Sequence, residues 1–207
     1  MKDIYKYIDE NADEYIADLQ AFIRKPSVSA QNIGLEECAE YVKDQMHKDG
    51  LPADLHEIPG GPPLVFGHLK SSQSKKTLFC YSHYDVQPPE PIEKWSHGGP
   101  WSGALVDNVI YGRGATDNKG GLLAFNKAAK AFLKVRGEVP LNLKFFYEGE
   151  EEIGSVHLGP WVEKNKKLLE ADGMHCLDGT VDTFDKVPEV ELGLKSVLFI
   201  ELIARGS

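Results

Sequence analysis

Cysteine is scarce in this sequence, and so are long apolar runs. The 207 residues include three cysteines, Cys38, Cys80 and Cys176, which are widely spaced, lie in apolar segments and form no Cys-x-x-Cys pair. This pattern excludes a disulfide framework and a thiolate zinc site, and it predicts reduced cysteines in the core of an intracellular protein. The N-terminal segment is too polar for a signal peptide, and no apolar run reaches membrane-spanning length. We therefore expect a cytoplasmic protein with no membrane partner.

Basic residues are scarce as well, with 23 Lys and Arg against 32 Asp and Glu and a formal net charge of −9. A surface that binds nucleic acid or an anionic membrane needs a basic stripe, so this balance argues against both partners. It is compatible with a cation site without predicting one. The remaining composition, 42% hydrophobic and 27% charged, is that of an ordinary globular protein with one sizeable core.

Helix and strand patterns alternate along the chain. The spacing of apolar residues predicts helices at 3–25, at 35–48, from the turn at 112–121 to about 136, and at about 156–169. Apolar or alternating runs predict strands at 64–69, 77–82, 109–111, 141–147, 174–177 and 196–203. The stretch 87–107, rich in Pro, Gly and Trp, is predicted to be an irregular covering loop. The alternation indicates an α/β fold of three layers, with a mixed, mostly parallel sheet and helices on both faces.

The strand predicted at 141–147 ends in a run of carboxylates. Glu150, Glu151 and Glu152 are consecutive, and Glu148 lies just before them. Like charges at the end of an apolar strand repel one another, so something must offset that repulsion. Solvent does so for most acidic runs. A bound cation is the alternative, and the ends of other strands favour it.

Three further residues of metal-binding type, His83, Asp117 and Asp178, each follow a predicted strand. Ligands gather at the carboxyl ends of strands in such sheets, so we expect these side chains to meet Glu151 and Glu152. One imidazole with several carboxylates suits Zn²⁺, Mn²⁺ or Co²⁺. Carboxylates in excess of what one ion needs predict two ions with a bridging carboxylate, ~3.5–4 Å apart. Taken singly, each residue has a commoner structural reading, a hydrogen-bonding His or a turn Asp. Their combination is what favours a metal centre.

Spacing within the motifs adds chemical detail. Asp85, two residues beyond His83, can accept a hydrogen bond from the second ring nitrogen and so fix the imidazole. Adjacent glutamates can divide their roles, one as a ligand and the other as a base. The turn GRGATDNKGG at 112–121 carries neither a Walker nor a dinucleotide fingerprint, which weakens a phosphate-binding interpretation.

Three motifs, SHYDVQP, GRGATDNKGG and EGEEEIGS, occur in that order. Together they resemble the co-catalytic zinc aminoacylase and dipeptidase family, which includes carnosine-type dipeptidases, acetylornithine deacetylase, desuccinylases and carboxypeptidase-like hydrolases. The VQP after the His-x-Asp is most similar to the dipeptidase branch. The resemblance, from about Glu14 to the end, implies a metallopeptidase with two divalent ions, Zn²⁺ before Mn²⁺ or Co²⁺. Its substrates would be small peptides or N-acyl amino acids that carry a carboxylate.

The resemblance also implies roles for single residues. His83 would bind one metal ion and Asp85 would orient it, while Asp117 would bridge the two ions. Asp178 resembles the family's further ligand for the ion held by His83. The surrounding DGTVDTF departs from the usual pattern, which leaves Asp182 as an alternative ligand.

In the same family resemblance, Glu151 would be the general base and Glu152 a ligand of the second ion. The family's last metal-binding His, and the lid domain through which the family forms homodimers, have no counterpart in this sequence. We therefore expect residues 1–195 to form the catalytic portion and 196–207 a strand leading toward the absent lid. His157 is a weak candidate for the replacement ligand, and the chain is expected to be an incomplete, weakly active or inactive fragment.

Two alternatives from other classes stay open. A truncated, non-catalytic relative would act as a metal- or partner-binding module, although the intact Glu151 and Glu152 argue against it. A metal-dependent phosphohydrolase would also use carboxylates, but the mixed His and Glu set and the missing phosphate cradle argue against that. Metal analysis, together with assays on dipeptides, N-acyl amino acids and a phosphate ester, distinguishes the three.

Overall fold

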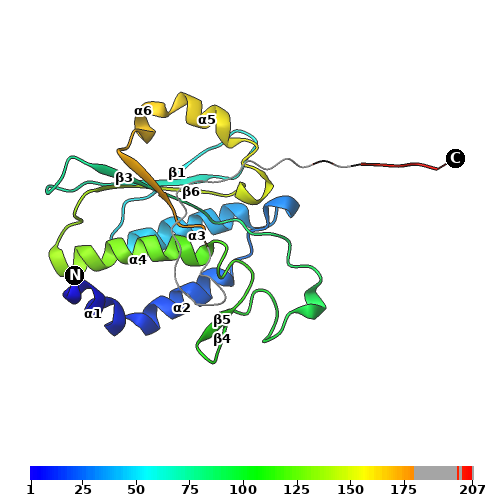
Figure 1. Ribbon diagram of the computed structural model, residues 1–207, viewed down its shortest axis with the longest axis horizontal. Coiled ribbons are helices and arrows are strands. Elements are labelled where there is room, and N and C mark those ends of the chain that lie inside the picture. Colours follow the sequence, from blue (N-terminus) through cyan, green and yellow to red (C-terminus); the bar gives the residue numbers. More distant parts are fainter. Residues whose placement is uncertain (180–199, 201, 207) are drawn as a thin grey trace.

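A computed structural model describes residues 1–179, 200 and 202–206 of the protein. It contains a five-stranded sheet with helices on both faces and a separate two-stranded hairpin (Figure 1). Asp182 lies outside the described residues, as do most of the predicted strand 196–203 and the domain boundary before it. No helix in the described part of the chain is long and apolar enough to cross a membrane.

The central sheet is mixed, as predicted, with the order β1-β2-β6-β3-β7. Its strands are β1 (Asp54–His56), β2 (Leu64–Leu69), β3 (Thr77–His83), β6 (Asn142–Glu148) and β7 (Gly173–Cys176). β3 runs parallel to β6 and β7, while β2 is antiparallel to β1 and β6. Two of the four pairings are thus parallel. The short connection between β1 and β2 allows only an antiparallel pair. In the β3–β6 register His83 lies opposite Glu148, so both strands end at the same edge.

The strand predicted at 109–111 is present as β5 (Val109–Tyr111), but it pairs with β4 (Ala104–Val106) and not with the central sheet. β4 lies within the stretch 87–107, and the prediction that this stretch is irregular throughout was wrong there. Asp107 and Asn108, both at positive φ, form the two-residue turn, and this Asp-Asn pair was the signal that marks the hairpin.

The helices predicted at 35–48 and up to 136 are confirmed as α3 (Leu35–Lys48) and α4 (Lys119–Arg136). The other two predicted helices are each interrupted. The first is divided into α1 (Lys2–Glu10) and α2 (Ala12–Ile23), and the second into α5 (Leu158–Lys164) and α6 (Lys166–Leu169).

An asparagine lies at each interruption. Asn11 Nδ2 donates a hydrogen bond to Tyr7 O (2.7 Å), and Asn165 Nδ2 donates one to Trp161 O (2.8 Å). In each case the side-chain amide bonds the carbonyl four residues earlier, and at Asn165 that carbonyl also accepts the backbone N–H of the same residue at 3.1 Å. The apolar periodicity continues across both asparagines, so it could not reveal the breaks.

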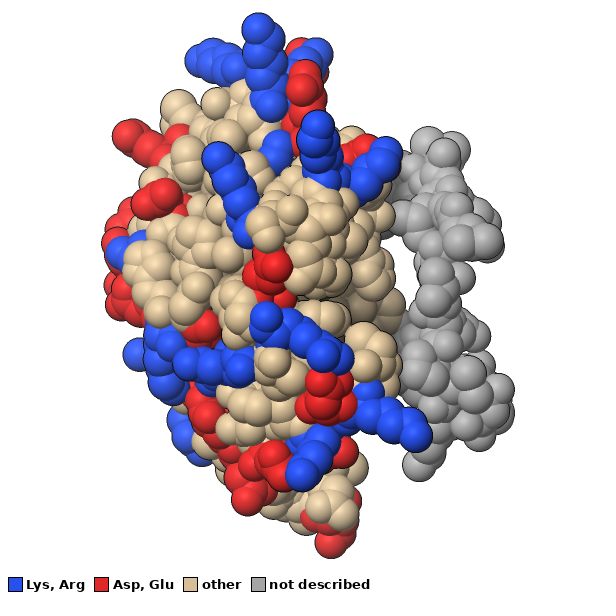
Figure 2. All heavy atoms as spheres, turned by 90° about the vertical axis from the view of Figure 1, so that its left-hand side faces the viewer, with Lys and Arg blue, Asp and Glu red and all other residues tan. Residues whose placement is uncertain are grey.

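Charged side chains of both signs are mixed over the face that Figure 2 shows. Solvent-exposed charges of the protein form several close pairs, among them Lys76 with Asp172 at 2.7 Å and Arg136 with Asp3 at 2.8 Å. Exposed pairs of this kind contribute ~0–1 kcal/mol each to stability, because water screens them and ordering the side chains costs entropy. The buried charges described below are a different case.

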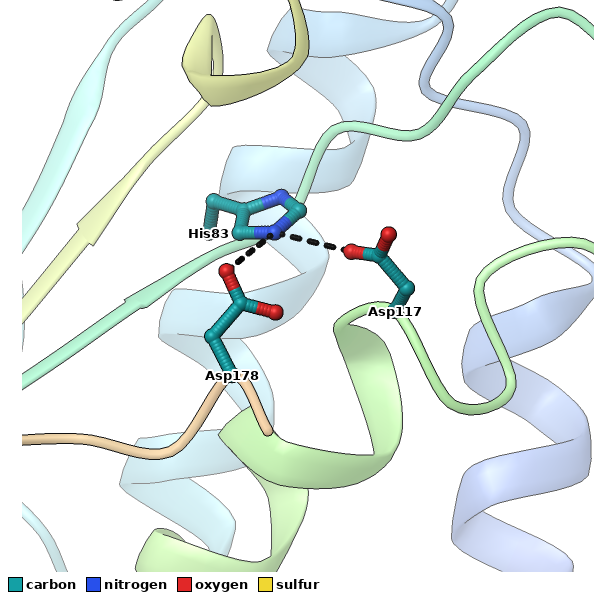
Figure 3. Close-up of side chains that lie close together, drawn as sticks. All are labelled: His83, Asp117 and Asp178. Carbon is teal, nitrogen blue, oxygen red and sulfur yellow. Dashed lines mark ion pairs between the residues drawn. The ribbon is translucent and has the colours of Figure 1, made fainter. Parts of the chain in front are cut away.

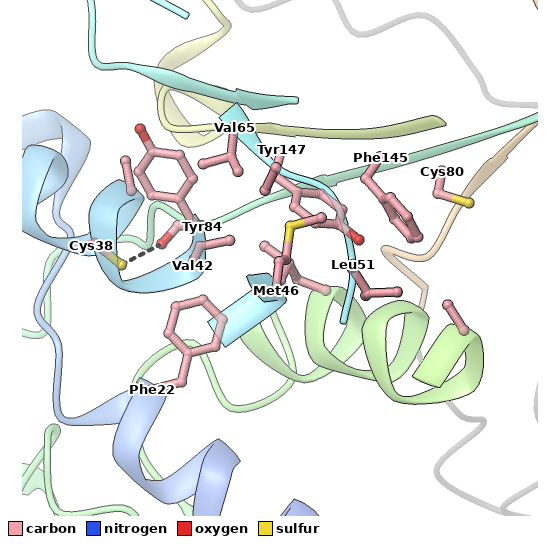
Figure 4. Packing of buried hydrophobic residues seen from close by; sticks show 14 of the residues in the cluster. Phe22, Cys38, Val42, Met46, Leu51, Val65, Cys80, Tyr84, Phe145 and Tyr147 are labelled. Carbon is pink, nitrogen blue, oxygen red and sulfur yellow. Dashed lines mark hydrogen bonds between the residues drawn. The ribbon is translucent and has the colours of Figure 1, made fainter. Parts of the chain in front are cut away.

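Side chains alternate across β6 as predicted. Phe145 and Tyr147 enter the larger of two cores, between the sheet and helices α2 to α4, while Phe146 packs on the opposite face with Trp161 of α5. Figure 4 shows the larger core, with Phe22 among its members. Burying one such side chain stabilises the fold by roughly 1.5–3 kcal/mol. The two cores therefore hold β3 and β6 firmly, and with them the sheet edge where both strands end.

The three cysteines are free, and two of them lie in the larger core. Cys38 and Cys80 are buried, as predicted. The prediction that Cys176 is also a core residue was wrong, because this thiol is exposed. Cys176 belongs to β7, which is the last strand of the sheet in the described residues and whose four residues are all exposed.

Candidate metal centre

His83 is the last residue of β3, and its imidazole is fully buried. β3 is held by β6 on one side and β7 on the other, so the position of the ring is well determined. Asp117 lies just before α4, and its peptide bond to Asn118 is cis. Asp178 follows β7. Three distant segments thus bring one imidazole and two carboxylates to a single sheet edge (Figure 3).

The Nε2 atom of His83 faces carboxylate oxygens. It lies 3.1 Å from Asp117 Oδ1, 3.5 Å from Asp178 Oδ2 and 3.9 Å from Glu151 Oε2. The nitrogen is buried and makes no hydrogen bond of good geometry within the described residues. One ligand atom each from His83, Asp117 and Asp178 lies within 4.8 Å of the others. A buried polar atom without a partner costs free energy, and a metal ion among these oxygens would supply the partner.

The electrostatics of the cluster also favour a cation. Burial by itself lowers the pKa of His83, but the contacts with Asp117, Asp178 and Asp85 outweigh burial and raise the pKa to about 12. The carboxylates therefore stabilise a positive charge at this position. A divalent ion bound by the neutral imidazole would take the place of the proton.

Asp85 is fully buried and connects the imidazole to the acidic turn. His83 Nδ1 hydrogen-bonds the backbone O of Asp85 at 3.0 Å, whereas the His-x-Asp spacing predicted a bond to the carboxylate, whose Oδ1 lies 3.2 Å from the same nitrogen. The two carboxylate oxygens of Asp85 also accept the backbone N–H groups of Glu151 (3.2 Å) and Glu152 (3.1 Å), which the sequence did not indicate. Asp85 therefore holds the histidine through its backbone O and the main chain of both glutamates through its carboxylate.

Glu151 and Glu152 lie in η3 (Glu151–Ile153), a short 3-10 turn after β6, and burial raises the pKa of both. Their carboxylates have different surroundings. Glu152 accepts hydrogen bonds from the backbone N–H and the side chain of Gln87 and is not in the close group around His83. No hydrogen bond to the Glu151 carboxylate is found in the described residues, and one of its oxygens faces His83 Nε2.

A glycine allows two of these segments to approach closely. A Cβ atom at Gly121 would lie 2.2 Å from Leu177 O and 2.1 Å from Asn118 Oδ1. No other residue fits at this contact between α4 and the end of β7, and the contact is what brings Asp178 beside Asp117. Gly121 thus serves the close packing of these two segments.

His157 lies away from this centre. Its Nδ1 is 2.8 Å from Glu150 Oε1, and its backbone N–H donates to Glu150 Oε2 (3.0 Å). It is not in the group around His83, so the described geometry gives no support to His157 as a replacement ligand. The histidine is instead engaged by the first carboxylate of the acidic run.

Two buried polar residues next to the site were given no role of their own by the sequence analysis. Glu148 Oε1 accepts hydrogen bonds from Tyr81 Oη (2.6 Å) and Ser155 Oγ (2.8 Å), which ties the end of β6 to the end of the acidic turn. Lys119, at the start of α4, is fully buried and donates to Phe22 O (3.2 Å) at the end of α2. Apolar periodicity carries no signal for such residues. Their place inside the motifs YEGEEEIGS and GRGATDNKGG was the only indication.

Comparison with known proteins agrees with this geometry. The model of Peptidase family M20/M25/M40 matches residues 79–193. The chain is 32% identical over 219 residues to the Cys-Gly metallodipeptidase dug1 of Schizosaccharomyces pombe, an alignment that covers 98% of this chain and 45% of that protein.

Two solved structures share the fold. The M20 family metallo-carboxypeptidase Sso-CP2 from Sulfolobus solfataricus aligns with a TM-score of 0.74 and 42% identity, over 81% of this chain and 37% of that one. Human carnosine dipeptidase 1 aligns with a TM-score of 0.79 and 32% identity, over 86% of this chain and 41% of that one. The chain therefore spans less than half the length of each of these relatives.

Proposed function

Because the chain belongs to Peptidase family M20/M25/M40, we propose that it carries the metal centre of a hydrolase acting on peptide or amide bonds in small substrates. Its relatives are named as a Cys-Gly metallodipeptidase, a carnosine dipeptidase and a carboxypeptidase. These names support short peptides with a free carboxylate as substrates, and we extend this substrate class to N-acyl amino acids. That residues 1–195 form the catalytic portion stays a prediction. So does the cytoplasmic location, which we infer from the unpaired cysteines.

We propose that the centre binds two divalent ions. His83 and Asp178 would hold one ion, Glu152 would hold the other, and Asp117 would bridge them. The observation that carries this proposal is the buried Nε2 of His83, which faces two carboxylates without a hydrogen bond. Mixed imidazole and carboxylate donors suit Zn²⁺, with Mn²⁺ and Co²⁺ as alternatives. When bound, such ions lower the pKa of a water ligand to about 7 and polarise the scissile carbonyl.

The side chain of Glu151 would carry the proton from the attacking water to the leaving amine. Glu151 would accept a proton from the attacking water as the water oxygen bonds to the carbonyl carbon. The glutamate would then give that proton to the amine nitrogen as the C–N bond breaks, which regenerates the carboxylate. Acid–base catalysis of this kind contributes ~10²–10⁴-fold in rate. The raised pKa of Glu151, caused by burial, suits this role, and Asp85 holds the backbone N–H of the same residue.

Metal content and a substrate panel test the proposal. Elemental analysis should find zinc or manganese in the purified chain, and dipeptides or N-acyl amino acids should be hydrolysed in preference to a phosphate ester. Turnover by the 207 residues alone is expected to be weak, so product is measured at high enzyme concentration. Glu151→Gln should abolish turnover and leave the metal bound, because it removes the base but no ligand.

Each result has a consequence. A chain that binds no metal would contradict the proposal, and so would a Glu151→Gln variant with unchanged turnover. Metal binding with no turnover on any substrate would favour the second interpretation, a metal- or partner-binding module. Preferential hydrolysis of the phosphate ester would favour a phosphohydrolase.

A further inference from the structure

Gln87 lies two residues after Asp85, in the segment that follows β3, and its backbone is well supported. The preceding residue, Val86, is fully buried and its N–H donates to Ser27 O (2.9 Å). Val86 also forms an isolated parallel bridge with Val28. A rigid piece of backbone therefore presents the Gln87 side chain, although the side chain itself is exposed.

Gln87 donates three hydrogen bonds to one residue, Glu152. Its backbone N–H bonds Oε1 at 3.2 Å, and its side-chain Nε2 bonds Oε2 at 2.8 Å and the backbone O at 3.1 Å. Both carboxylate oxygens and the main chain of Glu152 are thus held by a residue 65 positions earlier. An ionised carboxylate has about four lone-pair sites, so each oxygen keeps one for a further partner.

The neighbouring glutamate differs in this respect. The backbone N–H groups of Glu151 and Glu152 are both held by Asp85, so the two residues have equivalent main-chain support. Only the Glu152 carboxylate is held by Gln87, however, while no hydrogen bond to the Glu151 carboxylate is found in the part of the chain that the structure describes. A ligand needs a fixed carboxylate, whereas a base must be free to exchange protons.

We propose that Gln87 is a positioning residue, which holds the Glu152 carboxylate in the orientation that binds the second metal ion. This inference rests on the proposed function, since it assigns a supporting group to one of the proposed ligands. Ligating carboxylates are commonly held by hydrogen bonds from residues behind them, and loss of such a partner costs ~10–100-fold in metal affinity or activity.

The test is a calorimetric titration of the metal-free 207-residue chain with Mn²⁺ and, separately, with Zn²⁺. Gln87→Met removes the amide at nearly constant length. Gln73→Met is a matched control, because Gln73 Nε2 donates to Glu138 Oε1 at the same 2.8 Å on an exposed surface. We expect the wild type to bind two ions, and we expect Gln73→Met to bind each of them with the same affinity as the wild type. Gln87→Met should lose ~10–100-fold in affinity for one ion and leave the other unchanged.

A double-mutant cycle makes the assignment specific to Glu152. In a Glu152→Gln background, Gln87→Met should cause no further loss of affinity, because the carboxylate that it supports is already gone. Additive losses would overturn the inference, and so would equal weakening of both ions. If the wild type binds two ions and Gln87→Met binds both with wild-type affinity, Gln87 has no such role and the proposed function stands. A wild type that binds fewer than two ions would contradict the two-ion centre itself.

Discussion

The protein contains two groups of carboxylates whose repulsion is offset in different ways. In one group, which we call the lysine-paired cluster, Glu14, Asp18 and Asp49 meet Lys127 and Lys130 of α4. Lys127 Nζ lies 2.6 Å from both Asp18 Oδ2 and Asp49 Oδ2, and Lys130 Nζ lies 2.8 Å from Glu14 Oε1 and 2.9 Å from Asp49 Oδ1. The cations of this cluster are side chains of the protein itself.

The candidate metal centre is the other group. In the described residues no lysine or arginine lies within ion-pair distance of Asp117, Asp178, Glu151 or Glu152, and His83 is the single basic partner. The pKa values reflect this contrast. The hydrogen bond from Lys130 lowers the pKa of Glu14, whereas burial raises the pKa of Glu151.

The comparison shows that a group of acidic residues does not by itself predict a metal site. Both groups contain three ligand atoms within 4.8 Å of one another. The lysine-paired cluster contains enough cations to be a structural ion-pair network, while in the described residues the centre around His83 has no lysine or arginine of its own. The lysines, and not the carboxylates, distinguish the two.

The largest effect is expected from breaking the lysine-paired cluster. Lys127→Met should lower the free energy of unfolding by ~3–5 kcal/mol, because it leaves two buried carboxylates without their shared cation. Urea denaturation measures the loss. A decrease below about 1 kcal/mol would mean that this network behaves like an exposed ion pair and that the contrast with the metal centre is smaller than described.

The next effect is metal-induced stabilisation. Zn²⁺ at 100 times its dissociation constant should raise the free energy of unfolding of the wild type by ~2.7 kcal/mol. Asp117→Asn should remove most of this increment, because it removes the proposed bridging ligand. Asp18→Asn is the control: it lowers the stability of the metal-free chain but should keep the full increment. An increment that is lost in Asp18→Asn and kept in Asp117→Asn would show that the metal binds at the lysine-paired cluster and would contradict the proposed centre.

Acidification of the metal-free chain should act on the two groups in opposite directions. Pairing lowers the pKa of Glu14 below its usual 4.5, so its stabilisation is present above that pH and is lost as pH falls through the lowered value. Burial raises the pKa of Glu151 above 4.5, so its ionised form destabilises the fold, and this cost disappears as pH falls through the raised value.

Urea denaturation of wild type, Glu14→Gln and Glu151→Gln between pH 7 and 3 tests this difference. Relative to the wild type at pH 7, Glu14→Gln should be less stable and Glu151→Gln more stable. Both differences should shrink as the pH falls. The same sign for the two variants would show that the two groups do not differ as proposed.

The smallest effect concerns the edge of the lysine-paired cluster. Lys48 Nζ lies 3.1 Å from Asp18 Oδ1, close to the distance made by Lys127, but its side chain is 54% exposed against 6% for Lys127. Lys48→Met should therefore cost less than ~1 kcal/mol in the same denaturation experiment. A loss equal to that of Lys127→Met would show that distance, and not burial, governs these pairs.

Much of the fold could be predicted because apolar periodicity reports which side chains are buried. The helix at 35–48 and the strands that became β3 and β6 were found in this way, since their inward faces are continuous. The breaks at Asn11 and Asn165 were missed because the apolar periodicity continues across both asparagines. The approach of His83 and Asp178 followed from the rule that strand ends share one sheet edge, whereas Asp117 follows a strand outside that sheet and lies just before α4. Gln87 was missed because its only distinctive contact is with a residue far along the chain.

The order of strands and helices, the family motifs and the residue types at the sheet edge were determined by the sequence alone, because each is expressed over a few neighbouring residues. Only the tertiary structure decided which acidic groups are neutralised from within. Lys127 and Asp18 are 109 positions apart, and nothing local in either segment indicates their pairing. Coulomb energies depend on distance in space and on burial, and both exist only after the chain has folded.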